Sequence, residues 1–149
     1  MRTQKTLVVV ADAASARFYE ASGIGRDMVE LTELAHSQSI PPGRELERDR
    51  SPRTHDSSGP ARHGTEPADS PRRNLKRAFA EAVANTIDTA AAGKRFDRIA
   101  IAAPPAMLGD LRSAMRPETR AIVAAELDKD LVHVPARDLR QHFRDLLVF

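Results

Sequence analysis

The sequence predicts one three-layer α/β domain, built on a mixed five-stranded sheet with helices on both faces. Three observations support this fold class. A valine-rich run from Thr6 to Asp12 is typical of a central strand that is buried on both sides. Two more strand-like segments follow it directly, and from residue 70 onward helical and strand-like segments alternate. The resulting order, β-β-β-α-β-α-β-α, favours hairpin pairing of the first three strands and right-handed crossovers between the later ones.

Length and composition limit the number of domains and the classes of site that the chain can contain. The 149 residues suit a single domain spanning 1–149, and the absence of cysteine excludes disulfides and thiolate metal sites. The first ten residues hold only a short apolar run, so we expect no signal peptide, no membrane contact and a cytoplasmic protein. The net charge of +2 implies no particular partner, although arginine greatly outnumbers lysine, at 19 to 4.

The first three strands read as a meander. After Thr6 to Asp12, the segment Ala16 to Ala21 continues as a second strand that begins beyond a short turn. Residues Met28 to His36 alternate between apolar and polar side chains, which is typical of a half-exposed edge strand. Together the three segments predict one half of the sheet.

A long segment rich in proline and arginine, residues 37–70, follows the third strand. Its only aliphatic side chains larger than alanine are Ile40 and Leu46. Ordering the backbone costs about 1–2 kcal/mol per residue, whereas burying an aliphatic side chain returns only about 1.5–3 kcal/mol. We therefore expect a mobile basic loop.

The segment after this loop predicts the longest helix of the chain. Ser70 is a good N-cap residue, Pro71 suits the first helical position, and Gly93 ends the helix. Apolar side chains at helical spacing predict the buried stripe. Its predicted members are Leu75, Phe79, Ala82, Val83, Thr86, Ile87 and Ala90.

The remaining elements complete the α/β alternation. Arg98 to Ala103 predicts a short apolar strand, and Pro104 and Pro105 open a helix that runs to about Met115. A helical turn within Pro117 to Ala124 leads into a strand at Ile122 to Leu127. Pro135 to Leu146 predicts a last amphipathic helix, whose apolar face carries Leu139, Phe143, Leu146 and Leu147.

The start of the long helix is the strongest candidate site. Helix N-termini favour anions, yet this one carries cations in its first two turns, a pattern that suits phosphate groups. The candidate nucleic-acid or anion-binding residues are Arg72, Arg73, Lys76 and Arg77, together with the loop arginines Arg48, Arg50, Arg53 and Arg62. The alternative is a solvated basic face. No aromatic residue interleaves with these arginines, so any RNA contact would be to the backbone and weakly sequence-specific.

A second candidate is a crevice lined by Asp12, Ser15 and Arg17. It would form if the first and fourth strands are adjacent and parallel, because α/β sheets bind ligands at the carboxyl ends of such strands. The simpler interpretation of Asp12 is that its side chain caps the turn that follows. A lone carboxylate does not make an active site, so we expect no enzyme activity, no cofactor and no metal site.

Three stretches resemble the bacterial host attachment protein family. They are Val9 to Asp12 followed by Ala16 to Phe18, Ala102 to Pro105 with Leu108 to Arg112, and Glu126 to Leu131. The resemblance implies an RNase H-like fold, similar to the central domain of the eukaryotic and archaeal class-one peptide chain release factors. It covers most of the chain outside the loop.

The resemblance to release factors also bears on function. In those proteins the segment before the long helix carries a Gly-Gly-Gln tip, whereas here Gly43, Gly59 and Gly64 are isolated, so peptide-release activity is not expected. The leading hypothesis is a non-enzymatic protein that contacts the ribosome or structured RNA through the loop and helix start. The alternatives are a protein–protein adaptor in attachment to host cells and a small metal-dependent hydrolase. The oligomeric state is left open.

Overall fold

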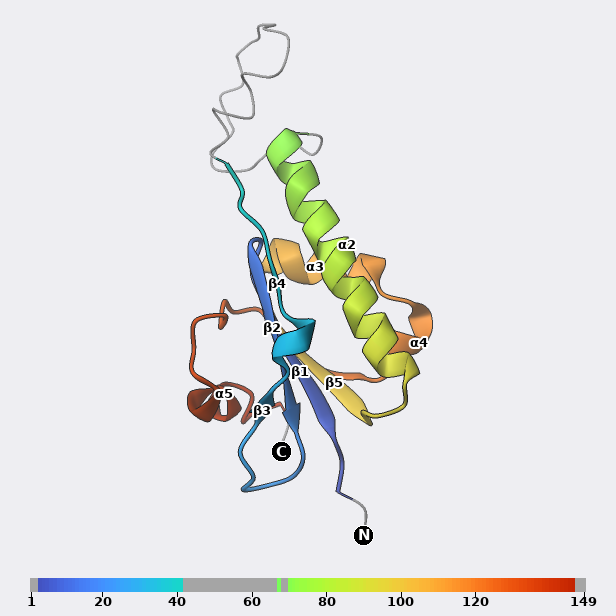
Figure 1. The fold of residues 1–149 in the computed structure, drawn as a ribbon, viewed down its shortest axis with the longest axis vertical. Coiled ribbons are helices and arrows are strands. Elements are labelled where there is room, and N and C mark those ends of the chain that lie inside the picture. Colours follow the sequence, from blue (N-terminus) through green and yellow to red (C-terminus); the bar gives the residue numbers. More distant parts are fainter. Residues whose placement is uncertain (1–2, 42–66, 68–69, 147–149) are drawn as a thin grey trace, which may run out of the picture.

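The computed structural model describes residues 3–41, 67 and 70–146. Its first two strands, β1 (Thr6–Ala11) and β2 (Ser15–Ala21), form an antiparallel hairpin. The long helix α2 (Pro71–Ala92) leads to β5 (Arg98–Ala102), and α3 (Pro105–Ala114) follows. This arrangement is the mixed α/β fold that the sequence predicted, with an open sheet (Figure 1).

Short elements complete the chain. Two very short strands, β3 (Val29–Glu30) and β4 (His36–Ser37), both pair antiparallel with β2. The 3-10 helix η1 (Thr32–Leu34) lies between them. After α3 come α4 (Pro117–Arg120), β6 (Val123–Leu127) and α5 (Ala136–His142). The described sheet has six strands in the order β3-β2-β1-β5-β6, with β4 on β2, and the β1–β5 and β5–β6 pairs are parallel.

The prediction of one continuous strand from Met28 to His36 was wrong. Residues 28–36 form β3, a 3-10 turn and β4 rather than one strand. Leu31 is buried in the core beneath α2, and Leu34 packs against that same core. In a strand, residues three apart point to opposite faces, whereas in a 3-10 helix they lie on the same side. The break therefore lets both leucines reach one core.

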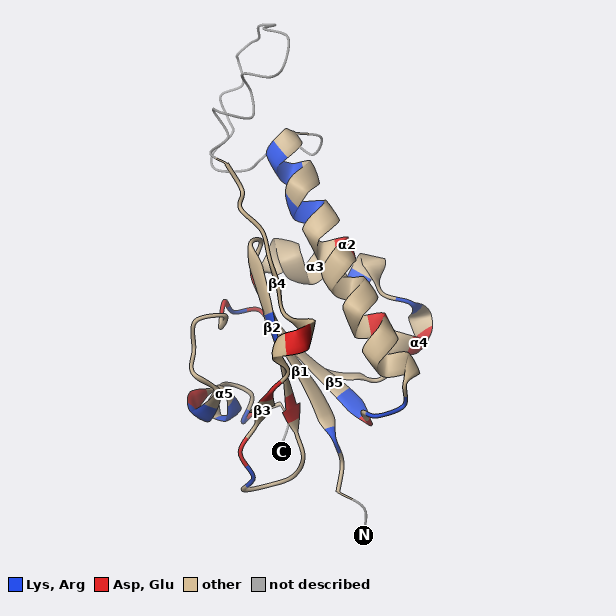
Figure 2. Cartoon of the chain, in the orientation of Figure 1, with Lys and Arg blue, Asp and Glu red and all other residues tan. Residues whose placement is uncertain are grey.

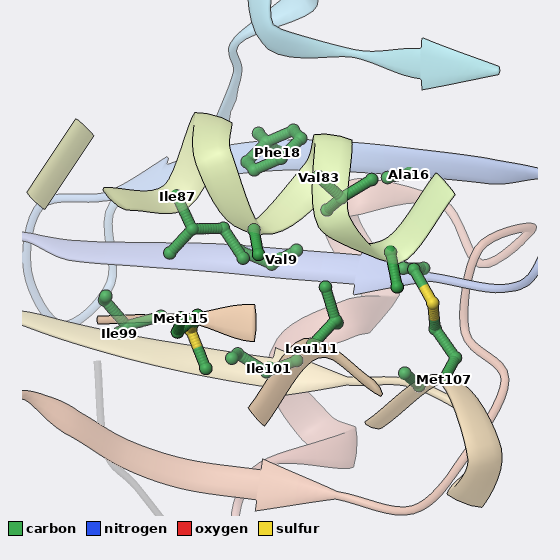
Figure 3. Close-up of a cluster of buried hydrophobic side chains, with 14 of the residues drawn as sticks. Val9, Ala16, Phe18, Val83, Ile87, Ile99, Ile101, Met107, Leu111 and Met115 are labelled. Carbon is green, nitrogen blue, oxygen red and sulfur yellow. The ribbon is translucent and has the colours of Figure 1, made fainter. Parts of the chain in front are cut away.

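Helices cover both faces of the sheet. One core joins alternate residues of β1 and β5 to α2 and α3, and Figure 3 shows Val83 and Ile87 of α2 packed near Val9. The other core lies under α5, where Leu139 and Phe143 are fully buried. The three-layer arrangement follows from β1, every residue of which is buried.

Two helices differ in detail from their predicted faces. In α2 the buried stripe includes Ala80, Ala84 and Asp88, whereas Ala82 is exposed, because α2 packs on α3 as well as on the sheet. The last helix ends at His142, and Leu146 is 49% exposed rather than buried. Leu147 lies outside the described residues.

The predicted loop spans 37–70, and the structure describes only its ends. Ser37 belongs to β4, the backbone N–H of Gln38 donates to the Ala14 carbonyl at 2.8 Å, and Ser70 caps α2. The loop therefore begins later than predicted. Residues 42–66 and 68–69, and with them the predicted mobility, lie outside the described residues.

Candidate functional site

The candidate site lies at the carboxyl ends of β1 and β5. These strands are adjacent and parallel, with Thr6 opposite Arg98 and Val10 opposite Ala102. This pairing confirms the condition on which the predicted crevice depended. Asp12 follows β1 directly, and Pro104 is the residue before α3, so both lie at the edge where α/β sheets place ligands.

Asp12 caps the turn between β1 and β2, as the sequence predicted. Its Oδ1 accepts hydrogen bonds from the backbone N–H groups of Ala14 and Ser15, each at 2.8 Å, and from the Ser15 hydroxyl at 3.2 Å. The Asp12 N–H donates to the Ser15 carbonyl at 2.9 Å. The turn is thus held by the side chain that enters the site.

The start of α2 is built as its sequence indicates. The Ser70 hydroxyl oxygen accepts from the Arg73 N–H at 3.0 Å, and Pro71 occupies the first helical turn. That turn contains no acidic residue. Figure 2 shows Lys and Arg gathered on the first turns of α2, at the end of the helix furthest from the chain's N-terminus. The positive end of the helix dipole and these cations therefore reinforce each other.

One cavity of about 490 Å³ joins the two predicted sites. The turn after β1, the start of α2 and the start of α3 all contribute to its walls. Its lining residues are Asp12, Ala13, Ala14, Ile40, Arg72, Arg73, Lys76, Pro104, Ala106, Met107 and Asp110. Three cationic side chains and two carboxylates leave the lining with a small formal excess of positive charge. A cavity of this size accommodates a small molecule or part of a larger ligand.

Asp110 is a residue of the site that sequence reasoning missed. Its Oδ1 lies 2.6 Å from Nη2 of Arg73, and the two side chains are only 14% and 18% exposed. The pair links α3 to the start of α2. The sequence did contain a signal for this pair, because Asp110 lies beside the buried Leu111 of the same helix. An acidic side chain next to the buried stripe of a helix commonly pairs with a cation.

Arg17 does not belong to the crevice, so that part of the prediction was wrong. Its Nε and Nη2 donate to the Glu30 carboxylate at 3.0 and 2.9 Å, and its Nη1 donates to the Val132 carbonyl at 3.2 Å. The hydrogen bond with Glu30 raises the pKa of Arg17 above its ordinary value. Arg17 and Tyr19 share the face of β2 that packs under α5, whereas α2 covers the opposite face.

The remaining predicted site residues do not line the cavity or lie outside the described residues. Ser15 lies at the first position of β2 and bonds to Asp12, but it does not line the cavity. Arg77 also stays outside the lining, and its Nη1 donates to the Asn74 side chain at 3.1 Å. Arg48, Arg50, Arg53 and Arg62 lie outside the described residues.

The described residues contain neither a metal-ligand cluster nor a membrane-spanning helix. Within these residues, no three histidine or acidic side chains come together in a group that could hold a metal ion. No helix of the described part is long and apolar enough to cross a membrane.

Comparison with known families assigns the chain. A family model described as "protein required for attachment to host cells" matches residues 7–143, from the second residue of β1 to just beyond the end of α5. The chain belongs to the host attachment protein family. No curated protein matches its sequence. The cavity therefore lies within the region that this host attachment protein shares with its family.

Proposed function

We propose that this host attachment protein is a non-enzymatic, cytoplasmic binding protein that contacts structured RNA, such as that of the ribosome. The observation that carries the proposal is the cavity where Arg72, Arg73 and Lys76 meet at the N-terminus of α2. Cationic side chains and the N-terminal end of a helix both favour phosphate oxygens. Because this recognition is of the phosphate backbone, we expect little dependence on RNA sequence.

The charges of the cavity refine this proposal. Asp12 and Asp110 offset part of the charge of the three cationic side chains, so the lining keeps a small positive excess that favours an anion. The ion pair also limits the directions that the Arg73 guanidinium can take. The predicted contacts of Arg48, Arg50, Arg53 and Arg62 would add to this charge as the RNA backbone continues beyond the cavity.

The test is an anisotropy titration with a ribosomal RNA fragment at several salt concentrations. Each phosphate contact contributes about 0.7–0.9 to the slope of log affinity against log salt, so we expect about −3 to −5 for the wild type. Replacing Arg72 and Arg73 by Ala should reduce the magnitude of this slope by about 1.5. The matched control replaces Arg112 and Arg116, two exposed arginines that do not line the cavity. If the double variant keeps the wild-type slope, the helix start does not contact RNA phosphates and is only a solvated basic face.

An adaptor between proteins is the second candidate function, and the family description favours it. Affinity capture from a cell lysate, with and without ribonuclease, separates the two candidates. Loss of the captured material after ribonuclease treatment supports RNA binding. Capture of the same protein partner in both samples, together with an unchanged salt slope, would favour the adaptor.

A further inference from the structure

We propose that Gln38 is a positioning residue of this cavity, holding the start of α2 at a fixed distance from the turn after β1. This inference rests on the proposed RNA-binding function. Gln38 does not line the cavity itself. It acts through its neighbours, because its hydrogen-bond partners lie in two of the cavity walls.

The side-chain amide of Gln38 bridges two segments that are distant in sequence. Its Nε2 donates to the Ala13 carbonyl at 3.0 Å and to the Leu75 carbonyl at 3.3 Å. A glutamine amide has two N–H donors, so each carbonyl can take one. The backbone N–H of Gln38 also donates to the Ala14 carbonyl at 2.8 Å. Ala13 and Ala14 line the cavity, and Leu75 directly precedes the lining residue Lys76.

The start of α2 lies ahead of the part of the helix that packs in the hydrophobic core. The first buried residue of α2 is Phe79, so the helix begins two turns before its packing against the sheet. Figure 1 shows this end of α2 reaching past the neighbouring helix α3. The Arg73–Asp110 pair ties the overhanging turns to α3, and Gln38 ties them to the β1–β2 turn. The two ties together fix where the cations of the helix start lie.

This position matters for binding because several charges must reach phosphates at once. A displacement of about 1 Å is enough to weaken a site that depends on several simultaneous contacts. Removing the Gln38 amide should therefore lower RNA affinity without removing any charge. A purely structural role would instead lower the stability and leave RNA binding unchanged.

The experiment replaces Gln38 by Met, which keeps the length of the side chain and removes both donors, and separately by Ala. Gln141 is an exposed glutamine on α5, so Gln141→Met is the matched control. We expect Gln38→Met to weaken binding of the ribosomal RNA fragment by about threefold to tenfold and to reduce the salt slope. Amide hydrogen exchange should become faster in the first two turns of α2. Gln141→Met should leave RNA affinity, the salt slope and the hydrogen exchange of α2 unchanged.

A double-mutant cycle assigns the effect to the helix start. When Arg72 and Arg73 are already Ala, Gln38→Met should change RNA affinity by less than about twofold, because two of the three cavity cations that it positions are gone. An effect of equal size in both backgrounds, or wild-type affinity and slope for both Gln38 variants, would overturn the inference and leave the RNA-binding proposal standing. If the wild type shows no binding that depends on Arg72 and Arg73, the proposed function fails, and the positioning role fails with it.

Discussion

Arg73 of α2 and Asp110 of α3 form an ion pair at the wall of the cavity, with Nη2 2.6 Å from Oδ1. The residues are 37 positions apart, and the pair joins the two helices that cover one face of the sheet. Cations at a helix N-terminus are unfavourable by a few tenths of a kcal/mol when they stand alone. The carboxylate of Asp110 changes that balance, because it gives the mostly buried guanidinium a charged partner.

The first prediction follows from this pair. Arg73→Ala should destabilise the protein by about 1–3 kcal/mol, because it leaves a mostly buried carboxylate without its partner. Asp110→Ala should cost a similar amount, and the double variant should lose less than the sum of the single variants. Urea denaturation measures all three. The control is Arg112→Ala, which breaks an exposed pair with Glu126 and should cost less. Strictly additive losses would show that the two charges do not interact.

The second prediction concerns the core beneath α2. Phe79 is 6% exposed. Its ring packs edge-on against that of His36, with 6.2 Å between the ring centroids. Phe79→Ala should lower the free energy of unfolding by about 3–5 kcal/mol, because it leaves a cavity between α2 and the sheet. Ile24 is 78% exposed, so Ile24→Ala serves as a control with almost no effect. A loss below about 1 kcal/mol at Phe79, measured by denaturation, would contradict this packing.

The third prediction uses Tyr19, the only tyrosine of the chain. Burial raises its pKa above the ordinary value of about 10, and the nearby Arg17 offsets part of the increase. The unfolded chain therefore loses the phenolic proton at a lower pH than the folded protein does. Below about pH 10 this group should not alter stability, and above it the stability should fall as the pH rises.

Tyrosinate absorbance measures this titration directly, because no other side chain of the chain contributes to it. Tyr19→Phe should remove its share of the stability loss at high pH. The Tyr19 hydroxyl is buried and has no hydrogen-bond partner among the described residues, so the same variant should be neutral or slightly stabilising near pH 7. Ionisation of Tyr19 at or below its ordinary pKa in the folded protein would contradict the burial.

Features that depend only on residues close together in the sequence could be predicted from it. Ser70 and Pro71 start α2 and Gly93 caps its end, as the local pattern indicated. The valine run forms the fully buried β1, and Asp12 caps its turn. Each of these features follows from the spacing of residues within one or two turns, or from a side chain bonding to its own segment.

Contacts between distant segments were decided only by the tertiary structure. Alternation predicted one strand where Leu31 and Leu34 instead share a core, and it could not show that Arg17 bonds to the Val132 carbonyl on the other side of the sheet. The bonds from Gln38 to Leu75 and from Arg73 to Asp110 each span 37 residues. Such contacts depend on how α2 docks against the sheet and α3, which is a property of the packed layers and not of any local spacing.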